Sequence, residues 1–102
     1  MPFIRLCSAS ELPAEGEAAE ITVNDRVICV ANVNGEFSAI VNVCLPRGGP
    51  LGQGMIEGNK IVCPWHGWMF DVQTGAAVHD RQARVRIYPV KIEGEDAMID
   101  LE

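Results

Sequence analysis

The chain has 102 residues, 48% of them hydrophobic, and this length and composition predict one folded domain with a modest core. Its 14 acidic residues outnumber its 8 basic residues and give a formal net charge of -6. A surface of that sign repels nucleic acid and anionic membranes, so both classes of partner are disfavoured. The acidity suits transient docking on a basic partner protein, and it serves solubility equally well.

The apolar stretches are too short to span a membrane. They are of strand length and are interrupted by Asn or Gly, whereas a spanning helix needs roughly twenty apolar residues. Residues 1–5 lack the basic segment and apolar region that begin a signal peptide. We therefore expect a cytoplasmic protein. The four cysteines occur without any sign of secretion, which makes a disulfide framework the weaker interpretation.

Turn signals divide the first half of the chain into short strands. Asn24-Asp25 separates two β-branched runs, as expected for a hairpin with a two-residue turn. Asn34-Gly35 predicts a second hairpin, because both residues tolerate the positive φ of a type I′ turn. A surface turn is expected over residues 9–16, which Pro and Gly punctuate. The strands expected here cover residues 3–7, 20–23, 26–33 and 36–44.

The second half continues this pattern of short strands and turns. Gly58-Asn59 and Thr74-Gly75 predict turns, and residues 83–92 alternate charged with apolar side chains, as a strand with one buried face does. The strands expected here cover residues 60–62, 69–72, 83–92 and 97–101. Because no segment has sustained helical periodicity, the sequence predicts an all-β domain, a small antiparallel β-sandwich or barrel.

Residues 44–71 contain the side chains that carry chemistry. Two loops rich in Gly or Pro each open with a cysteine, Cys-Leu-Pro-Arg-Gly-Gly-Pro-Leu from Cys44 and Cys-Pro-Trp-His-Gly-Trp-Met-Phe-Asp from Cys63. Thiolates and imidazoles held on facing loops are the ligands that zinc and iron-sulfur clusters prefer. Cys44, Cys63 and His66 supply three such groups.

This stretch resembles the Rieske [2Fe-2S] family, whose ligand pattern is Cys-x-His, a spacer, and then Cys-x-x-His. Cys44, Cys63 and His66 are in register with that pattern, while Pro46 stands where the first His belongs. The Arg-Gly-Gly-Pro-Leu and Gly-Trp-Met-Phe-Asp segments that end the two loops also resemble those of Rieske-type ferredoxins. The resemblance covers nearly the whole chain.

The resemblance implies an incomplete ligand set. Carried over to this sequence, it places Cys44 and Cys63 on one iron and His66 on the other. Pro46 supplies no fourth ligand, because its nitrogen is a tertiary amide without an available lone pair. The implied cofactor is therefore a 2Fe-2S cluster that is labile or absent. The other histidine of the chain, His79, is expected at the surface of a polar loop, with an approach to the vacant position as the lesser alternative.

The resemblance also implies an organisation and a function. A single domain of residues 1–102 would consist of a base domain, 1–43 and 72–102, and cluster-binding loops, 44–71. Such a ferredoxin passes electrons from a flavoprotein reductase to a terminal oxygenase or reductase and has no catalytic residues of its own. A terminal oxygenase would need a further iron site of two histidines and a carboxylate, and both histidines of this chain have other assignments.

Two alternatives to an electron carrier stay open. One is a cluster-deficient structural or docking subunit, similar to the small subunit of nitrite reductase, which Pro46 would suit. The other is a mononuclear zinc site, since two Cys, one His and a water form a known catalytic set. The zinc alternative lacks a general base, because Asp71 belongs to the strand motif after the second loop.

The remaining cysteines and the aromatic residues near the loops are predicted to pack in the core. Cys7 and Cys29 lie within strand-like apolar runs, where a free cysteine behaves as a small hydrophobic residue. Trp65, Trp68 and Phe70 lie in and after the second loop, and aromatic side chains at such positions usually fill space against a small core.

Overall fold

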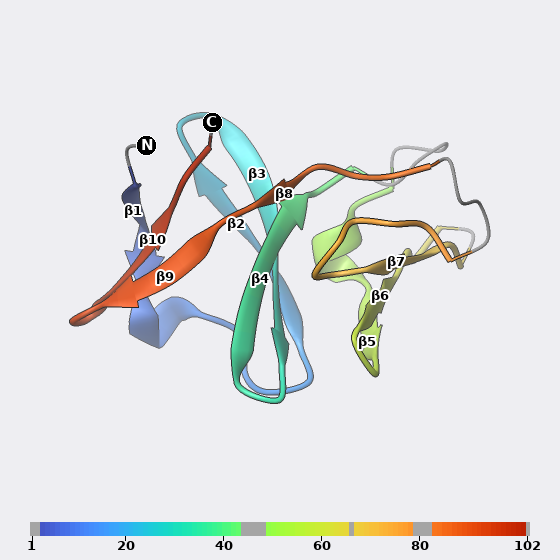
Figure 1. The fold of residues 1–102 in the computed structure, drawn as a ribbon, viewed down its shortest axis with the longest axis horizontal. Helices are drawn as coiled ribbons and strands as arrows, with labels where there is room; N and C mark the ends of the chain where they lie inside the picture. Colours follow the sequence, from blue (N-terminus) through green and yellow to red (C-terminus); the bar gives the residue numbers. More distant parts are fainter. Residues whose placement is uncertain (1–2, 44–48, 66, 79–82, 102) are drawn as a thin grey trace.

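The computed structural model describes residues 3–43, 49–65, 67–78 and 83–101, which form three antiparallel sheets (Figure 1). The fold is all-β, as the sequence predicts, and the helical structure among these residues is two 3-10 turns, η1 (Ala9–Glu11) and η2 (Leu51–Gln53). The strands are β1 (Ile4–Ser8), β2 (Ala18–Val23), β3 (Arg26–Val33), β4 (Glu36–Val41), β5 (Met55–Glu57), β6 (Lys60–Val62), β7 (Met69–Asp71), β8 (Ile87–Tyr88), β9 (Val90–Glu93) and β10 (Asp96–Ile99).

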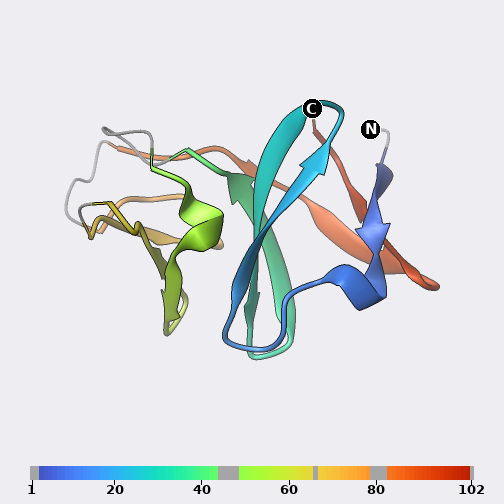
Figure 2. The ribbon, with the colours of Figure 1, turned by 180° about the vertical axis from the view of Figure 1, so that it is seen from behind.

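The three sheets lie side by side along the long axis of the molecule. A four-stranded sheet in the order β2-β3-β4-β8 occupies the middle, with β1-β10-β9 on one side and β5-β6-β7 on the other (Figures 1 and 2). Strands β5 and β6 lie between the two predicted loops in the sequence, and β7 ends the second loop. Cys63, the predicted ligand among the described residues, follows β6 at this end of the long axis.

Both predicted hairpins are confirmed, together with their turn chemistry. Asn24 and Asp25 have φ values of 49° and 62° between β2 and β3, and Asn34 and Gly35 have values of 55° and 86° between β3 and β4. Positive φ at both central residues is the signature of a type I′ turn, which matches the right-handed twist of the flanking strands. These turns fix the register of the central sheet.

Strand β3 is buried on both faces and separates two hydrophobic cores. Cys29 and Ala31 contribute to the core shared with β6 and β7, while Ile28 and Val30 contribute to the core shared with β1 and β10. All four side chains are at most 1% exposed. A strand covered on both faces is expected to be a nearly continuous apolar run, which β3 is.

Residues 83–92 do not form the single strand that their alternation predicts. They divide at Pro89 into β8, which pairs with β4, and β9, which pairs with β10. Proline has no N–H to donate and cannot continue a ladder, so Pro89 marks the crossing from one sheet to another. Accordingly Val85 lies in one core and Tyr88 in the other.

Two smaller differences concern the segment around the first loop. Strand β4 ends at Val41 rather than at residue 44, and Val43 instead forms an isolated bridge with Pro50. Strand β5, which pairs with β6, is not predicted by the sequence. Its pattern is weak because Met55 is 74% exposed and Glu57 is also exposed, so alternation of apolar residues does not reveal it.

Candidate functional site

In the sequence, Cys44 lies between β4 and η2, and Cys63 and His66 lie between β6 and β7. Cys63 is within the described residues and directly follows β6. Cys44 and His66 lie outside the described residues, as do Pro46 and His79. The geometry of the site is therefore built from Cys63 and from the residues that flank the other positions.

Cys63 carries a free thiol that is 1% exposed. Its N–H donates to the carbonyl of Trp68 at 2.7 Å, and its carbonyl accepts from the N–H of Gly67 at 3.1 Å. Gly67 has a φ of 74°, a left-handed conformation that favours glycine. These two hydrogen bonds tie Gly67 and Trp68 back to Cys63 and fix the main chain on both sides of the cysteine.

Gly49, in the tail of the first loop, lies directly against the second loop. A Cβ built on Gly49 would stand 2.9 Å from Cys63 Sγ and 2.9 Å from Trp65 Cγ, closer than a real Cβ approaches other atoms. A side chain at this position would force Cys63 or Trp65 to shift. The two predicted loops are thus juxtaposed, with the buried thiol of one facing the main chain of the other.

The first loop is closed at its base by main-chain contacts. Val43 and Pro50 form an antiparallel bridge, and the N–H of Leu51 donates to the carbonyl of Asn42 at 3.0 Å. Leu51 is fully buried in the core shared with β6 and β7. The chain therefore enters and leaves residues 44–48 from a fixed pair of positions.

Asp71 is committed to a structural role after the second loop. Its Oδ1 accepts from the N–H groups of Gln73 and Thr74 at 2.8 and 3.1 Å, and its Oδ2 accepts from Asn59 Nδ2 at 3.0 Å. With both oxygens engaged in this turn, the carboxylate is not presented to the loops as a general base. This observation counts against a hydrolytic zinc site.

The aromatic residues divide into two groups. Phe70 is fully buried, and the ring of Trp68 packs 6.2 Å from it, which confirms the packing role predicted for both. Trp65 is 53% exposed, so the core role predicted for it is wrong. It projects from the tip of the second loop beside Gly49, where the loop has no core to cover it. Val43 and Val78 add exposed apolar surface at residues that flank undescribed segments.

Cys7 and Cys29 are core residues, as predicted, with exposures of 4% and 0%. Burial raises the pKa of the Cys29 thiol to about 12, with a smaller contribution from the negative charge of Glu20. Burial likewise raises the pKa of Cys7. Both thiols are therefore protonated at neutral pH, and neither has the thiolate character of a metal ligand or nucleophile.

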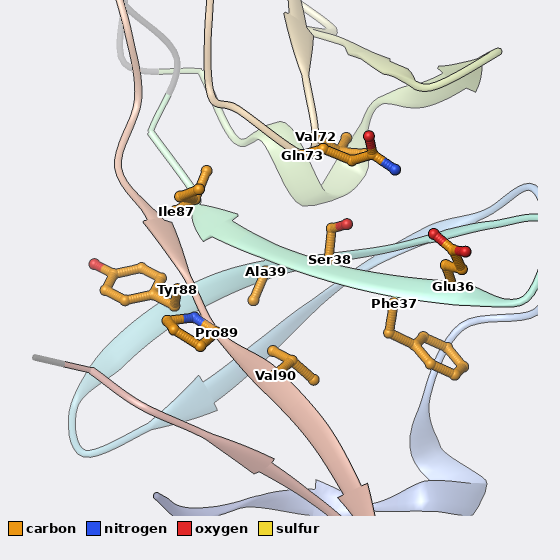
Figure 3. Close-up of a pocket in the computed structure, with 10 residues that line it drawn as sticks. All are labelled: Glu36, Phe37, Ser38, Ala39, Val72, Gln73, Ile87, Tyr88, Pro89 and Val90. Atoms are coloured by element: carbon orange, nitrogen blue, oxygen red, sulfur yellow. The ribbon is translucent and has the colours of Figure 1, made fainter. Parts of the chain in front are cut away.

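A groove of about 460 Å³ lies between β4, the β8–β9 segment and the turn after β7 (Figure 3). Its lining side chains are mostly apolar, and none of them is a histidine or a cysteine. Among the described residues, Cys63 does not line the groove, so the groove is separate from the candidate site. The residues that line it are Glu36, Phe37, Ser38, Ala39, Val72, Gln73, Ile87, Tyr88, Pro89 and Val90.

Comparison with known proteins decides which kind of site this is. The chain matches the Rieske [2Fe-2S] domain over residues 3–89. It belongs to the Rieske [2Fe-2S] family. It is 39% identical over 92 residues to the ferredoxin component of a naphthalene 1,2-dioxygenase system from Pseudomonas aeruginosa. The matched region covers 89% of this chain and 88% of that protein.

Solved structures of the Rieske family have the same fold. The ferredoxin of Sphingomonas yanoikuyae B1 superposes with a TM-score of 0.86 at 33% identity, over 99% of this chain and 100% of that one. A protein described as the small subunit of an NADPH nitrite reductase superposes with a TM-score of 0.83 over 97% of this chain and 98% of that one. Its identity is 12%, so this second likeness concerns the fold alone.

This Rieske protein is an electron-transfer ferredoxin that serves redox partner proteins and is not itself a catalyst. Membership of the family implies a 2Fe-2S cluster as the cofactor. The described residues fit such a group at the second loop, where a buried free thiol faces the glycine backbone of the first. Pro46 lies outside the described residues, and a proline side chain has no ligand atom.

No helix within residues 3–43, 49–65, 67–78 and 83–101 has the length and apolar character needed to cross a membrane. Within the same ranges no three His, Cys, Asp or Glu side chains come together as a metal site. Cys63 is the one member of the predicted ligand set that falls inside them. The Gly-Gly-Pro run predicts that Gly49 belongs to a tight loop, and the structure adds its close approach to Cys63 and Trp65.

Proposed function

We propose that this Rieske ferredoxin binds its 2Fe-2S cluster through Cys44, Cys63 and His66 and that Pro46 leaves the histidine-bound iron one protein ligand short. The observation that carries the proposal is the buried free thiol of Cys63 against the backbone of Gly49. It places a ligand-type sulfur at the meeting point of the two loops. The bound cluster would accept and donate one electron at a time.

The proposed site belongs to loops 44–71, presented by a base domain of residues 1–43 and 72–102. The protein's own residues supply burial there, since Cys63 is shielded from water and its main chain is fixed by hydrogen bonds to Gly67 and Trp68. The partners we propose are the flavoprotein reductase and terminal oxygenase of a dioxygenase system, as in the naphthalene relative. The cytoplasmic location expected from the sequence is part of the proposal.

Pro46 favours one competing function, a cluster-deficient docking subunit. A three-ligand site loses metal more readily than a four-ligand one, and a chain that never holds the cluster would retain only the shape of the fold. The likeness in fold to the nitrite reductase small subunit is compatible with this alternative. The two functions differ in whether iron and sulfide are bound at all.

Restoring the histidine tests the proposal. Parent protein and Pro46→His are reconstituted anaerobically with iron and sulfide, and iron, acid-labile sulfide and the electron paramagnetic resonance spectrum are measured. We expect Pro46→His to hold a stable cluster with a Rieske spectrum and the parent to hold it weakly. In the Pro46→His background, Cys63→Ser should abolish binding, while Cys29→Ala, at a buried cysteine outside the site, should preserve it. A colourless Pro46→His protein would make the docking subunit the better description.

A further inference from the structure

Asn42, the residue after β4, forms the inner end of a polar network at the base of the first loop. It is 7% exposed. Its Oδ1 accepts from the N–H of Gly52 at 2.6 Å, and its main-chain carbonyl accepts from the N–H of Leu51 at 3.0 Å. One residue before the loop therefore binds two successive amides after it.

Glu20, on β2, forms the outer end of the same network. Its Oε2 accepts from Asn42 Nδ2 at 2.6 Å, and its Oε1 accepts from Gln53 Nε2 at 2.9 Å. The carboxylate thereby connects the side chain that precedes the loop with the 3-10 turn that follows it. Hydrogen bonds to an ionised acceptor are among the stronger ones in proteins, so this connection is firm.

Gly52 shows how closely these parts are packed. A Cβ on Gly52 would lie 2.5 Å from Glu20 Cγ and 2.9 Å from Asn42 Oδ1. The turn Leu51–Gln53 thus rests directly on Glu20 and Asn42. The same turn continues the segment that holds Gly49 against Cys63 Sγ.

We propose that Asn42, supported by Glu20, is a positioning residue that holds the tail of the first loop over Cys63 and thereby sets how tightly the cluster is enclosed. The inference rests on the proposed function, since it assigns a role toward the cluster that Cys63 would bind. Among the described residues, no hydrogen bond joins Asn42 to Cys63. Asn42 acts by fixing Leu51 and Gly52, and through them the approach of Gly49.

Removing the Asn42 side chain should loosen this contact. The N–H of Gly52 would be left buried without its acceptor, and an unsatisfied buried group is costly enough to favour local opening. The segment that contains Gly49 would then move away from the Cys63 thiol more often. The thiol of Cys63, now 1% exposed, would become open to reagents without unfolding of the base domain.

Alkylation of Cys63 in the metal-free protein measures this opening without any cluster. We expect Asn42→Leu to raise the rate of Cys63 alkylation by roughly tenfold or more. Mass spectrometry follows the alkylation of each cysteine separately. Asn32→Leu is the matched control. Asn32 is 6% exposed, donates to the carbonyl of Pro13 and accepts from the N–H of Gly35, but lies in a hairpin away from the loops.

The control separates positioning from general stability. Both substitutions should lower the melting temperature, whereas only Asn42→Leu should expose Cys63. Equal alkylation rates in parent and Asn42→Leu would overturn the inference, as would an equal rise in Asn32→Leu. If Asn42→Leu does not fold, Gln53→Ala is the second variant. It removes only the hydrogen bond from Gln53 Nε2 to Glu20 and should raise the rate of Cys63 alkylation by a smaller factor. No rise in this variant would also overturn the inference.

Rescue tests the role of Glu20. Glu20→Ala should accelerate Cys63 alkylation, whereas Glu20→Gln keeps an acceptor for Asn42 Nδ2, and Gln53 can reverse its amide to accept from the new one. Glu20→Gln should therefore react nearly as slowly as the parent. If the two Glu20 variants behave alike, Glu20 has no positioning role.

The same substitutions in the Pro46→His background test the effect on the cluster. Asn42→Leu should shift the reduction potential and the electron paramagnetic resonance spectrum and speed cluster loss, while Asn32→Leu should leave all three unchanged. If Pro46→His binds no cluster, the proposed function fails, and the alkylation rates still decide the role of Asn42. If the cluster binds and Asn42→Leu changes neither alkylation nor spectrum, the positioning role fails alone.

Discussion

Gly49 lies so close to the thiol of Cys63 that a Cβ on the glycine would stand 2.9 Å from the sulfur. Contact between a side-chain-free backbone and a buried sulfur brings main-chain atoms within reach of whatever the sulfur binds. Amide groups near cluster sulfurs are one of the means by which Rieske proteins tune potential. The site that we propose therefore includes this glycine as well as the cysteine.

Gly49→Ala should push the two loops apart. We expect it to lower the free energy of unfolding by about 1–3 kcal/mol, the usual cost of forcing an added carbon into a packed position. It should also speed alkylation of Cys63 and cluster loss in a Pro46→His background. Denaturant titration and mass spectrometry measure these effects. Adding Trp65→Ala removes the contact with Trp65 Cγ but keeps those with Cys63 Sγ and Trp65 Cβ, so a full recovery in the double variant would show that the Cys63 contact has no role.

Asp71→Ala should destabilise the turn after β7. The carboxylate accepts from two main-chain N–H groups and from Asn59, and its loss should cost about 1–3 kcal/mol. Asp96→Ala is a suitable control, because Asp96 forms a surface ion pair with Arg5 at 3.0 Å, and such pairs contribute about 1 kcal/mol or less. Thermal denaturation of both variants compares them. Equal losses would contradict the structural role given to Asp71.

Two glycines with positive φ should respond differently to alanine. Gly75 has a φ of 80°, and a Cβ there would collide with the carbonyl oxygen of Val85. Gly94 has a φ of 62° and open space around it. Gly94→Ala should cost about 1–2 kcal/mol from backbone strain alone, and Gly75→Ala clearly more. Urea denaturation of the two variants tests this order, and a smaller loss in Gly75→Ala would refute the collision.

The stability of the protein should decline at alkaline pH through Cys29. Its pKa in the folded state, about 12, exceeds the ordinary value of 9.0, because burial disfavours the thiolate. The unfolded chain therefore loses this proton first as pH rises, so the contribution to stability is complete below about pH 9 and is lost as pH approaches 12. Unfolding titrations across this range should show a shallower pH dependence in Cys29→Ala. An identical slope in both proteins would exclude Cys29 as the cause.

The parts of the fold that the sequence predicts correctly are those governed by local chemistry. Asn24-Asp25 and Asn34-Gly35 adopt the turns that their tolerance of positive φ suggests, because a two-residue hairpin depends on few other contacts. The motif around Cys63 can also be recognised from the sequence, because the spacing of ligand-type residues is a property of the sequence itself. Family membership followed from that spacing and is confirmed.

The parts that escaped prediction depend on contacts between distant segments. Charged and apolar residues do alternate over residues 83–92, but the segment divides at Pro89. The part before Pro89 pairs with β4 and the part after it pairs with β10, in a different sheet. Asn42 and Glu20 are ordinary polar residues in sequence and meet only when β2, β4 and η2 assemble. Trp65 is a large apolar residue of the kind that usually packs in a core, and its exposure follows from its position in the second loop.

Strand β3 should couple the two hydrophobic cores during unfolding. Its alternate side chains contribute to both cores, so we expect the two cores to lose their structure together. We therefore expect that the β5-β6-β7 sheet does not unfold separately from the rest of the domain. Amide hydrogens at the centres of β3 and β6 should exchange with solvent at similar, slow rates, and loss of metal should proceed from the folded domain rather than through separate melting of one end.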